Sequence, residues 1–115
     1  MQIIKTIPEQ LTNRQLYDLT MSPKTQKMSD AKGSRLEIAA VCIYEDADKK
    51  TGELRKVLAL VTPDGEIFAT NSATFQDDFA TMCEMFGDTG VTAIEVISGT
   101  SKAGREFITC AYAGD

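Results

Sequence analysis

The sequence of 115 residues contains no histidine, no tryptophan and only three cysteines. Histidine is the usual general base of enzymes and the commonest nitrogen ligand of metals, so its absence excludes Ser-His-Asp and Cys-His catalytic sites. Cys42, Cys83 and Cys110 are scattered along the chain and form no C-x-x-C pair, which gives little support to a zinc or redox motif. We therefore expect reduced core cysteines, no metal and no cofactor.

Long apolar runs are also missing. No run approaches the roughly 18–20 residues that span a bilayer. The N-terminal stretch MQIIKTIPEQ lacks the apolar segment and the small-residue cleavage site of a signal peptide. The length suits one compact domain with one core. We expect a cytoplasmic protein without a membrane segment.

Charge is present but unevenly distributed. The net charge is -5. Residues 1–35 nevertheless carry six basic and three acidic side chains, a net charge of +3, whereas residues 36–115 carry six basic and fourteen acidic side chains, a net charge of -8. A basic N-terminal segment attached to an acidic body indicates a local binding surface for a polyanion, although the net charge of the whole chain is negative. Chance in so short a segment is the alternative explanation.

The first 34 residues differ in pattern from the rest of the chain. TNRQLYDLTMS (12–22) predicts a short helix with Thr12 or Asn13 as N-cap and with Leu16 and Leu19 on one face. The following residues, up to the start of the first predicted strand, are polar and basic, which is typical of a loop or a mobile arm. We therefore divide the chain into a basic N-terminal arm, 1–34, and a body, 35–115.

The body alternates between two hydrophobic periods. RLEIAAVCIYE (35–45) begins with alternating apolar residues and becomes apolar on both sides, as expected of a strongly bent strand buried on both faces. Apolar residues then recur at helical spacing between residues 71 and 87, and we expect this stripe to form core. The predicted order is strand, strand, strand, helix, strand, strand, with the elements at 35–45, 54–62, 66–70, 71–87, 91–98 and 105–113.

This order is that of a mainly β protein built as a five-stranded barrel of the OB-fold type. Such barrels bind oligonucleotides on the face of their second and third strands and with the loops that join strands 1–2 and 4–5. Other α+β arrangements share the order, so topology alone leaves the fold open.

The segment SGTSKAGR (98–105) is rich in glycine, hydroxyls and cations. A P-loop needs G-x-x-x-x-G-K-[S/T] between a strand and a helix, but here Lys102 precedes the second glycine and a strand follows. The segment instead predicts a hairpin turn in which Gly99 and Gly104 relieve the backbone. In an OB barrel this turn joins strands 4 and 5 and would grip a strand of nucleic acid; a solvated turn is the alternative.

Binding single strands without sequence preference requires flat aromatic rings for the bases and cations for the phosphates. We expect Phe68 to point outward if Ile67 and Ala69 point inward, whereas Phe107 is expected in the core. The candidate stacking residues are Tyr44, Phe68 and Tyr112. The candidate phosphate contacts lie on the arm, on the first hairpin and on the last hairpin: Lys24, Lys27, Lys32, Arg35, Lys49, Lys50, Arg55, Lys56, Lys102 and Arg105. Core packing for the rings and solvated surface charge for single cations are the alternatives.

Three segments, GSRLEIAAVCIY, VLALVTPDGEIFATNSATF and VISGTSKAGREFITCAYA, together resemble the single-stranded DNA-binding proteins of protein-primed Bacillus phages. The shared features are a Gly-Ser start of a strand, an Asp-Gly turn before an aromatic strand, a serine at a helix start and a G-T-S-x-x-G hairpin. They cover about residues 33–113. The first 30 residues do not align with this pattern.

The resemblance implies a protein that coats single-stranded DNA during replication, without enzymatic activity and without a metal. Single-stranded DNA is then the main partner, and replication proteins such as a DNA polymerase would be further partners of a monomer or weak homo-oligomer. A protein-interaction module on the same fold is the second hypothesis, favoured by the acidic body. A thiol- or carboxylate-based hydrolase is the third, and it would need an exposed cysteine with a strongly lowered pKa.

Overall fold

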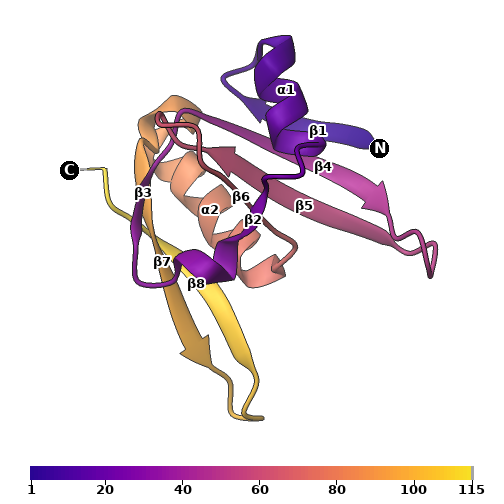
Figure 1. Ribbon diagram of the computed structural model, residues 1–115. Coiled ribbons are helices and arrows are strands. Elements are labelled where there is room, and N and C mark those ends of the chain that lie inside the picture. The colour runs from indigo at the N-terminus through magenta and orange to yellow at the C-terminus, as the bar shows by residue number, and fades with distance from the viewer. Residues whose placement is uncertain (115) are drawn as a thin grey trace.

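The computed structural model describes residues 1–114 and contains eight strands and two α-helices in one body (Figure 1). The strands are β1 (Gln2–Ile7), β2 (Gln26–Lys27), β3 (Arg35–Glu37), β4 (Ala40–Ala47), β5 (Leu54–Val61), β6 (Ile67–Thr70), β7 (Ala93–Thr100) and β8 (Glu106–Tyr112). The helices are α1 (Asn13–Thr20) and α2 (Ala73–Phe86), and two short 3-10 turns cover Met28–Ala31 and Asp88–Gly90. All six elements predicted for the body are therefore present.

The strands form two sheets. One has five strands in the order β1-β4-β5-β6-β2, and the other has three strands in the order β3-β7-β8. Within residues 1–114 no ladder joins β6 to β8, so the sheets do not close into the expected five-stranded barrel. The architecture is mixed α/β, with two separate sheets that share one bent segment.

That bent segment is the predicted strand at 35–45. It is divided into β3 and β4 at residues 38 and 39, where consecutive amides donate to different sheets. The amide of Ile38 donates to the carbonyl of Thr92 beside β7 (2.9 Å), and the amide of Ala39 donates to the carbonyl of Val61 in β5 (2.8 Å). The expected bend is confirmed, and it is the shortest of the chain segments that connect the two sheets.

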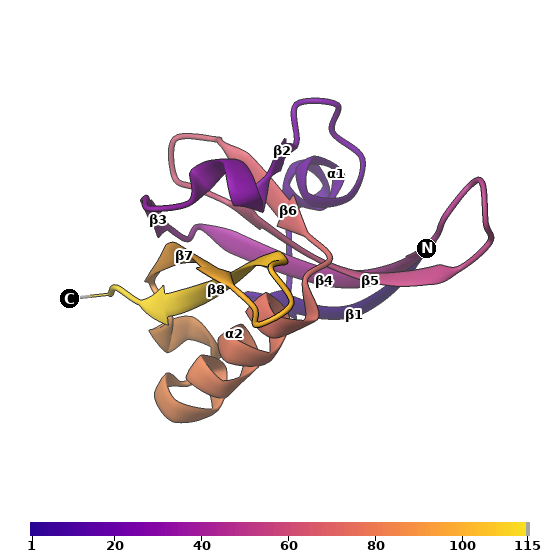
Figure 2. The same cartoon turned by 90° about the horizontal axis from the view of Figure 1, so that it is seen from below.

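The five-stranded sheet is buried on both of its faces (Figure 2). One face, with Val41, Leu58 and Leu60, belongs to the main core under α2 and the second sheet. The opposite face, with Cys42 and Ala59, belongs to a smaller core under α1. Burial on both faces explains why this part of the sequence is apolar on both sides rather than alternating.

Local signals in the body fold as predicted. Ser72 caps α2 by accepting a hydrogen bond from the amide of Phe75, and Gly87 ends the helix with a positive φ of 81°. The turn between β5 and β6 places Gly65 at a φ of 90°, a conformation that glycine adopts without steric cost. The start of α2 is further tied to β8, because the thiol of Cys110 lies 3.6 Å from the carbonyl oxygen of Phe75.

The N-terminal segment is more structured than the expected loop or mobile arm. β1 pairs antiparallel with β4, and β2 pairs parallel with β6. Thr12 caps α1 in a capping box with Gln15, as the sequence predicts. Met28 and Ala31 are buried in the main core, so two apolar side chains hold the otherwise polar stretch 24–34 against the body. Whether residues 35–115 alone bind DNA stays a prediction.

Candidate nucleic-acid interface

The hairpin between β7 and β8 projects from the body (Figure 1). Its turn contains two cations, Lys102 and Arg105. Its turn is closed by the amide of Ser101 donating to the carbonyl of Arg105 (2.8 Å), and Gly104 has a φ of 81°. The side chains of Lys102 and Arg105 are exposed, and within residues 1–114 neither is in an ion pair. The turn therefore presents two positive charges that form no ion pair within the described part of the chain.

An exposed aromatic ring lies directly behind this turn. Phe107 is the cross-strand partner of Gly99, and its side chain is 37% exposed, which corrects the expectation that it belongs to the core. A Cβ at residue 99 would lie 2.7 Å from Cζ of Phe107, so only glycine leaves room for the ring to lie over the neighbouring strand. Ile108 and Cys110 point to the opposite, buried side. The outer face of the hairpin is thus a flat ring beside two free cations.

The hairpin between β4 and β5 is built differently. One oxygen of Asp48 accepts hydrogen bonds from the amides of Lys50 (2.7 Å) and Thr51 (3.2 Å), and its other oxygen is paired with the guanidinium of Arg55. The two amides, and secondarily Arg55, lower the pKa of this carboxyl. Lys49 and Lys50 are exposed at the tip, and Arg55 is already shared with an acid.

Two adjoining hollows lie at the base of this hairpin. The first, about 330 Å³, is lined by Lys27 and Arg55 and by no acidic side chain. The second, about 300 Å³, is lined by Arg55, Lys56 and the acid Asp77. Both hollows have Asn71 and Arg55 among their lining residues, and they lie to either side of β5, with Lys56 on one and Val57 on the other. We call the two hollows together the basic groove; they place Lys27 of the N-terminal segment near two predicted cations of the first hairpin.

The remaining predicted cations lie apart from this groove. Lys24 and Lys32 are exposed in the connections before β2 and after the 3-10 turn. Arg35 donates through Nε to the carbonyl of Ala113 (2.9 Å) and through a terminal nitrogen to Glu37 (3.3 Å). Its guanidinium is therefore already engaged in holding β3 to the end of the chain.

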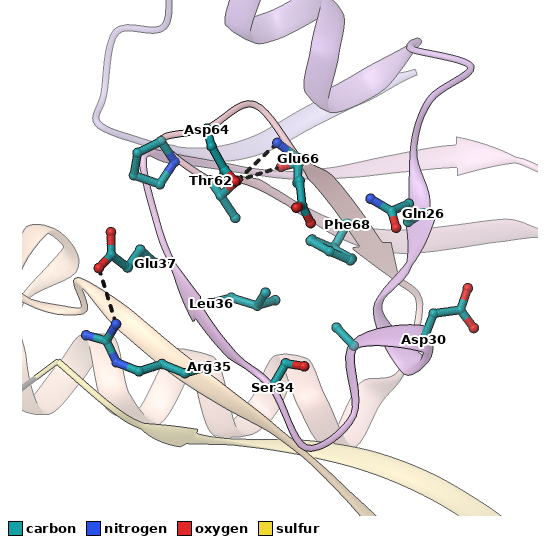
Figure 3. Close-up of a pocket in the computed structure, with 12 residues that line it drawn as sticks. Gln26, Asp30, Ser34, Arg35, Leu36, Glu37, Thr62, Asp64, Glu66 and Phe68 are labelled. Atoms are coloured by element: carbon teal, nitrogen blue, oxygen red, sulfur yellow. Dashed lines mark hydrogen bonds and ion pairs between the residues drawn. The ribbon is translucent and has the colours of Figure 1, made fainter.

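The largest hollow, about 600 Å³, is acidic (Figure 3). Arg35 is the single cation among its twelve lining residues, and that arginine is paired with Glu37. Four carboxylates line it: Asp30, Glu37, Asp64 and Glu66. A phosphate backbone would be repelled here, because like charges at this range disfavour each other. Size alone thus does not identify the site.

Two of the three predicted stacking residues are buried. Phe68 is 4% exposed and forms part of the main core at the wall of the acidic hollow, so the expectation that it points outward is wrong. Ile67 and Ala69 do point to the opposite side, but that side is covered by α1. Tyr44 is 8% exposed in the same smaller core, where burial raises the pKa of its hydroxyl. Successive side chains of a strand point to opposite faces of the sheet, and at Phe68 and Tyr44 both faces are buried.

Tyr112 is half-buried and already stacked on a protein ring. Its centroid lies 3.9 Å from that of Phe86, with an angle of 11° between the planes. Phe86 was expected in the core stripe of the helix but is 47% exposed. It occupies one face of the tyrosine, and a Cβ at Gly114 would lie 2.6 Å from Cζ of Tyr112. Little of the tyrosine ring is open to a base.

Helix α1 occupies much of the surface that an OB-type site would use. Leu16 and Leu19 pack on the outer face of β4, β5 and β6. Only the half of this face nearest the first hairpin, which contains Arg55 and Val57, stays open to the basic groove. The sequence predicted the helix and its apolar face but contained no signal for where that face would dock.

The three cysteines are unsuited to nucleophilic chemistry. Cys42, Cys83 and Cys110 are buried and free. Burial raises the pKa of each thiol, and that of Cys110 to about 12. A reactive cysteine needs the opposite shift, because the thiolate is the nucleophile. The condition set for a thiol-based enzyme is therefore not met.

Comparison with known proteins gives one match. A family model of the phi29 type, described as phage single-stranded DNA-binding protein, matches residues 14–112. The match includes α1, the basic groove and the β7–β8 hairpin, and it leaves out β1. Searches of curated proteins and of solved structures gave no match. No helix within residues 1–114 is long and apolar enough to cross a membrane.

Proposed function

Because the chain belongs to the phi29-type family of phage single-stranded DNA-binding proteins, we propose that it coats and protects single-stranded DNA during replication through base stacking and phosphate contacts. Members of this family are binding proteins and not enzymes. The proposal concerns how this chain binds, which family membership leaves open.

The observation that carries the proposal is the outer face of the β7–β8 hairpin. The exposed ring of Phe107 lies behind a turn whose two cations, Lys102 and Arg105, have no acidic partner within residues 1–114. Ring and cations match the two parts of an unpaired nucleotide, because every base has a flat face and every phosphate a negative charge. Each stacked base contributes about 1–3 kcal/mol and each neutralised phosphate adds to the salt dependence.

The basic groove extends this surface. Lys27, Arg55 and Lys56 lie along it at the base of the other hairpin. Figure 1 shows the two hairpins projecting in different directions with the start of α2 between them. We propose that a single strand runs from the groove to the β7–β8 hairpin, largely without regard to sequence. Lys49 and Lys50, at the tip of the first hairpin, would contact phosphates at its edge.

The acidic total of -5 is compatible with this path. Affinity depends on the phosphates that are neutralised locally rather than on the net charge. Four of the seventeen acids line the acidic hollow, away from this path, whereas Asp77 lines the groove itself. This separation would keep the strand on the groove and hairpin side.

The test is a titration of oligo-dT at several salt concentrations. We expect saturable binding whose logarithmic affinity falls linearly with the logarithm of salt concentration, by about 0.7 for each phosphate contacted. Low salt strengthens protein contacts to phosphates. The absence of any binding at low salt and about micromolar protein would therefore contradict the proposal.

A further inference from the structure

Among the described residues 1–114, one buried polar side-chain atom has no hydrogen-bond partner. It is Oε1 of Gln76, a residue that is only 6% exposed. Its amide nitrogen donates to the carbonyl of Lys56 (2.9 Å), which fixes the orientation of the amide. Reversing the amide would set two oxygens against each other. A buried acceptor left without a donor costs about 1–3 kcal/mol, so its presence calls for a ligand.

The fold explains why Gln76 occupies this place. The ladder between β5 and β6 ends at the pair Leu58 and Thr70, because the chain then turns into α2. The carbonyl of Lys56, two residues before Leu58, is left without a strand partner on that side. The amide of Gln76 takes over that role from the second turn of α2. The amide nitrogen of Gln76 is thus engaged in the fold, whereas its oxygen Oε1 receives no hydrogen bond within residues 1–114.

Gln76 is one of the residues that line the second hollow of the basic groove. Leu54, Lys56, Asn71 and Asp77 are also among the residues that line the hollow, whose volume is about 300 Å³. Leu54 is 72% exposed and Lys56 is in no ion pair within residues 1–114, so the rim can move to admit a ligand. A flat ring the size of one nucleobase fits such a volume.

We propose that this hollow is a pocket for one unstacked base, and that it selects bases with an exocyclic amino group. The proposal rests on the proposed function, since it assumes that single-stranded DNA reaches the groove. The unpartnered oxygen Oε1 of Gln76, a residue that lines the pocket, is the acceptor for such an amino group. An amino group brings two N–H donors, whereas uracil and thymine present a carbonyl at the corresponding edge. Lys56 at the rim would hold the phosphate of the same nucleotide.

The expected consequence is a preference of base composition within otherwise general binding. Oligo-dC should bind more tightly than oligo-dU of equal length, because the two differ at position 4 by an amino group against a carbonyl. A single hydrogen bond contributes about 1 kcal/mol, which corresponds to about a fivefold difference in affinity at each occupied pocket.

The experiment compares the affinities of the full chain for oligo-dC, oligo-dU and an oligomer of the 2-pyrimidinone deoxynucleoside. The last keeps the ring and lacks the amino group. We expect oligo-dC to bind about fivefold more tightly than either of the others. Gln76→Met, which keeps the length of the side chain and removes its acceptor, should make the three affinities equal. Thermal unfolding checks that the variant folds, and the comparison of ligands on the unmodified chain holds even if it does not.

The outcomes separate the two proposals. Equal affinities for oligo-dC and oligo-dU on the unmodified chain, or a preference that survives in folded Gln76→Met, would overturn the pocket and leave DNA binding intact. Failure to bind any of the three oligomers would overturn the proposed function, and the pocket with it.

Discussion

The two projecting hairpins both carry exposed cations, but their turns are organised differently. In the β4–β5 hairpin an acid organises the turn, because Asp48 accepts two backbone amides and pairs with Arg55. In the β7–β8 hairpin backbone bonds and the hydroxyl of Ser101 organise the turn, and Lys102 and Arg105 have no acidic partner in the part of the chain that the structure describes. A cation that already serves the fold is less available to a phosphate. Within residues 1–114, Arg55 of the first hairpin is shared with an acid, whereas Lys102 and Arg105 of the second are not.

The largest effect is expected from removing the ring of the second hairpin. Phe107→Ala should weaken binding to oligo-dT by roughly fivefold to a hundredfold, because one stacked base contributes about 1–3 kcal/mol. Fluorescence anisotropy of a labelled oligomer measures the change. Tyr17→Ala, which removes an exposed ring on α1, is the matched control and should leave the affinity unchanged. Equal losses in both variants would indicate that Phe107 has no special role.

The free cations of the same hairpin come next. Replacing Lys102 and Arg105 together by alanine should reduce the slope of logarithmic affinity against logarithmic salt concentration by about 1.4, since each phosphate contact contributes about 0.7. The domain should stay folded, because neither side chain is buried. Replacing Lys5 and Arg14, which are paired with Asp88 and Asp18, is the control of equal charge. If both double variants have the same slope, the charges of the hairpin act only through the net charge.

A smaller effect, of opposite sign, is expected in the first hairpin. Asp48→Asn keeps an oxygen for the amides of Lys50 and Thr51 and removes the charge that pairs with Arg55. The released guanidinium should raise the affinity for oligo-dT about threefold at physiological salt and steepen the salt slope by about 0.7. A variant that folds and binds no better than the original would show that Arg55 does not reach the strand.

The smallest effect concerns stability in acid. The pKa of Asp48 in the folded chain lies below its ordinary value, so its contribution to stability is present above that value and is lost as the pH falls through the lowered pKa. When the pH is lowered from about 5 to about 2, the unfolding temperature of the unmodified chain should fall further than that of Asp48→Asn. Thermal unfolding at the two ends of this range checks the prediction, and parallel losses would refute it.

Much of the body could be predicted from the sequence because local signals and tertiary packing agree there. The turn at Gly65, the N-cap at Ser72 and the stop at Gly87 each follow from a backbone requirement that few residues satisfy. The bend near residue 38 was visible as the change from alternating to continuous apolar residues. The strands that pair with one another could not be predicted, because the local sequence of a strand does not indicate its neighbour in the sheet. Closure into a barrel could therefore not be predicted either.

The candidate site was predicted less well, for a reason of the same kind. Phe68 is predicted to point outward because a strand usually has one wet face, but the main core buries Phe68 and α1 covers the opposite face of β6. Tyr44 lies in the smaller core under α1. Phe107 looked like core because its partner Gly99 was read only as a turn residue, although a glycine opposite an aromatic residue on a sheet can serve to make room for the ring. The cations of the hairpins were found by composition, but which of them are free depends on Asp48 and could be seen only in three dimensions.

The proposed path is tested most directly by mapping backbone amide shifts in nuclear magnetic resonance spectra as oligo-dT is added, which the mass of 12.5 kDa permits. We expect the largest shifts at residues 100–107 of the β7–β8 hairpin and at Lys27 and Lys56 of the basic groove. The amides around Asp30 and Asp64, beside the acidic hollow, should stay unmoved. Shifts centred on that hollow, with the hairpin unaffected, would contradict the proposed path.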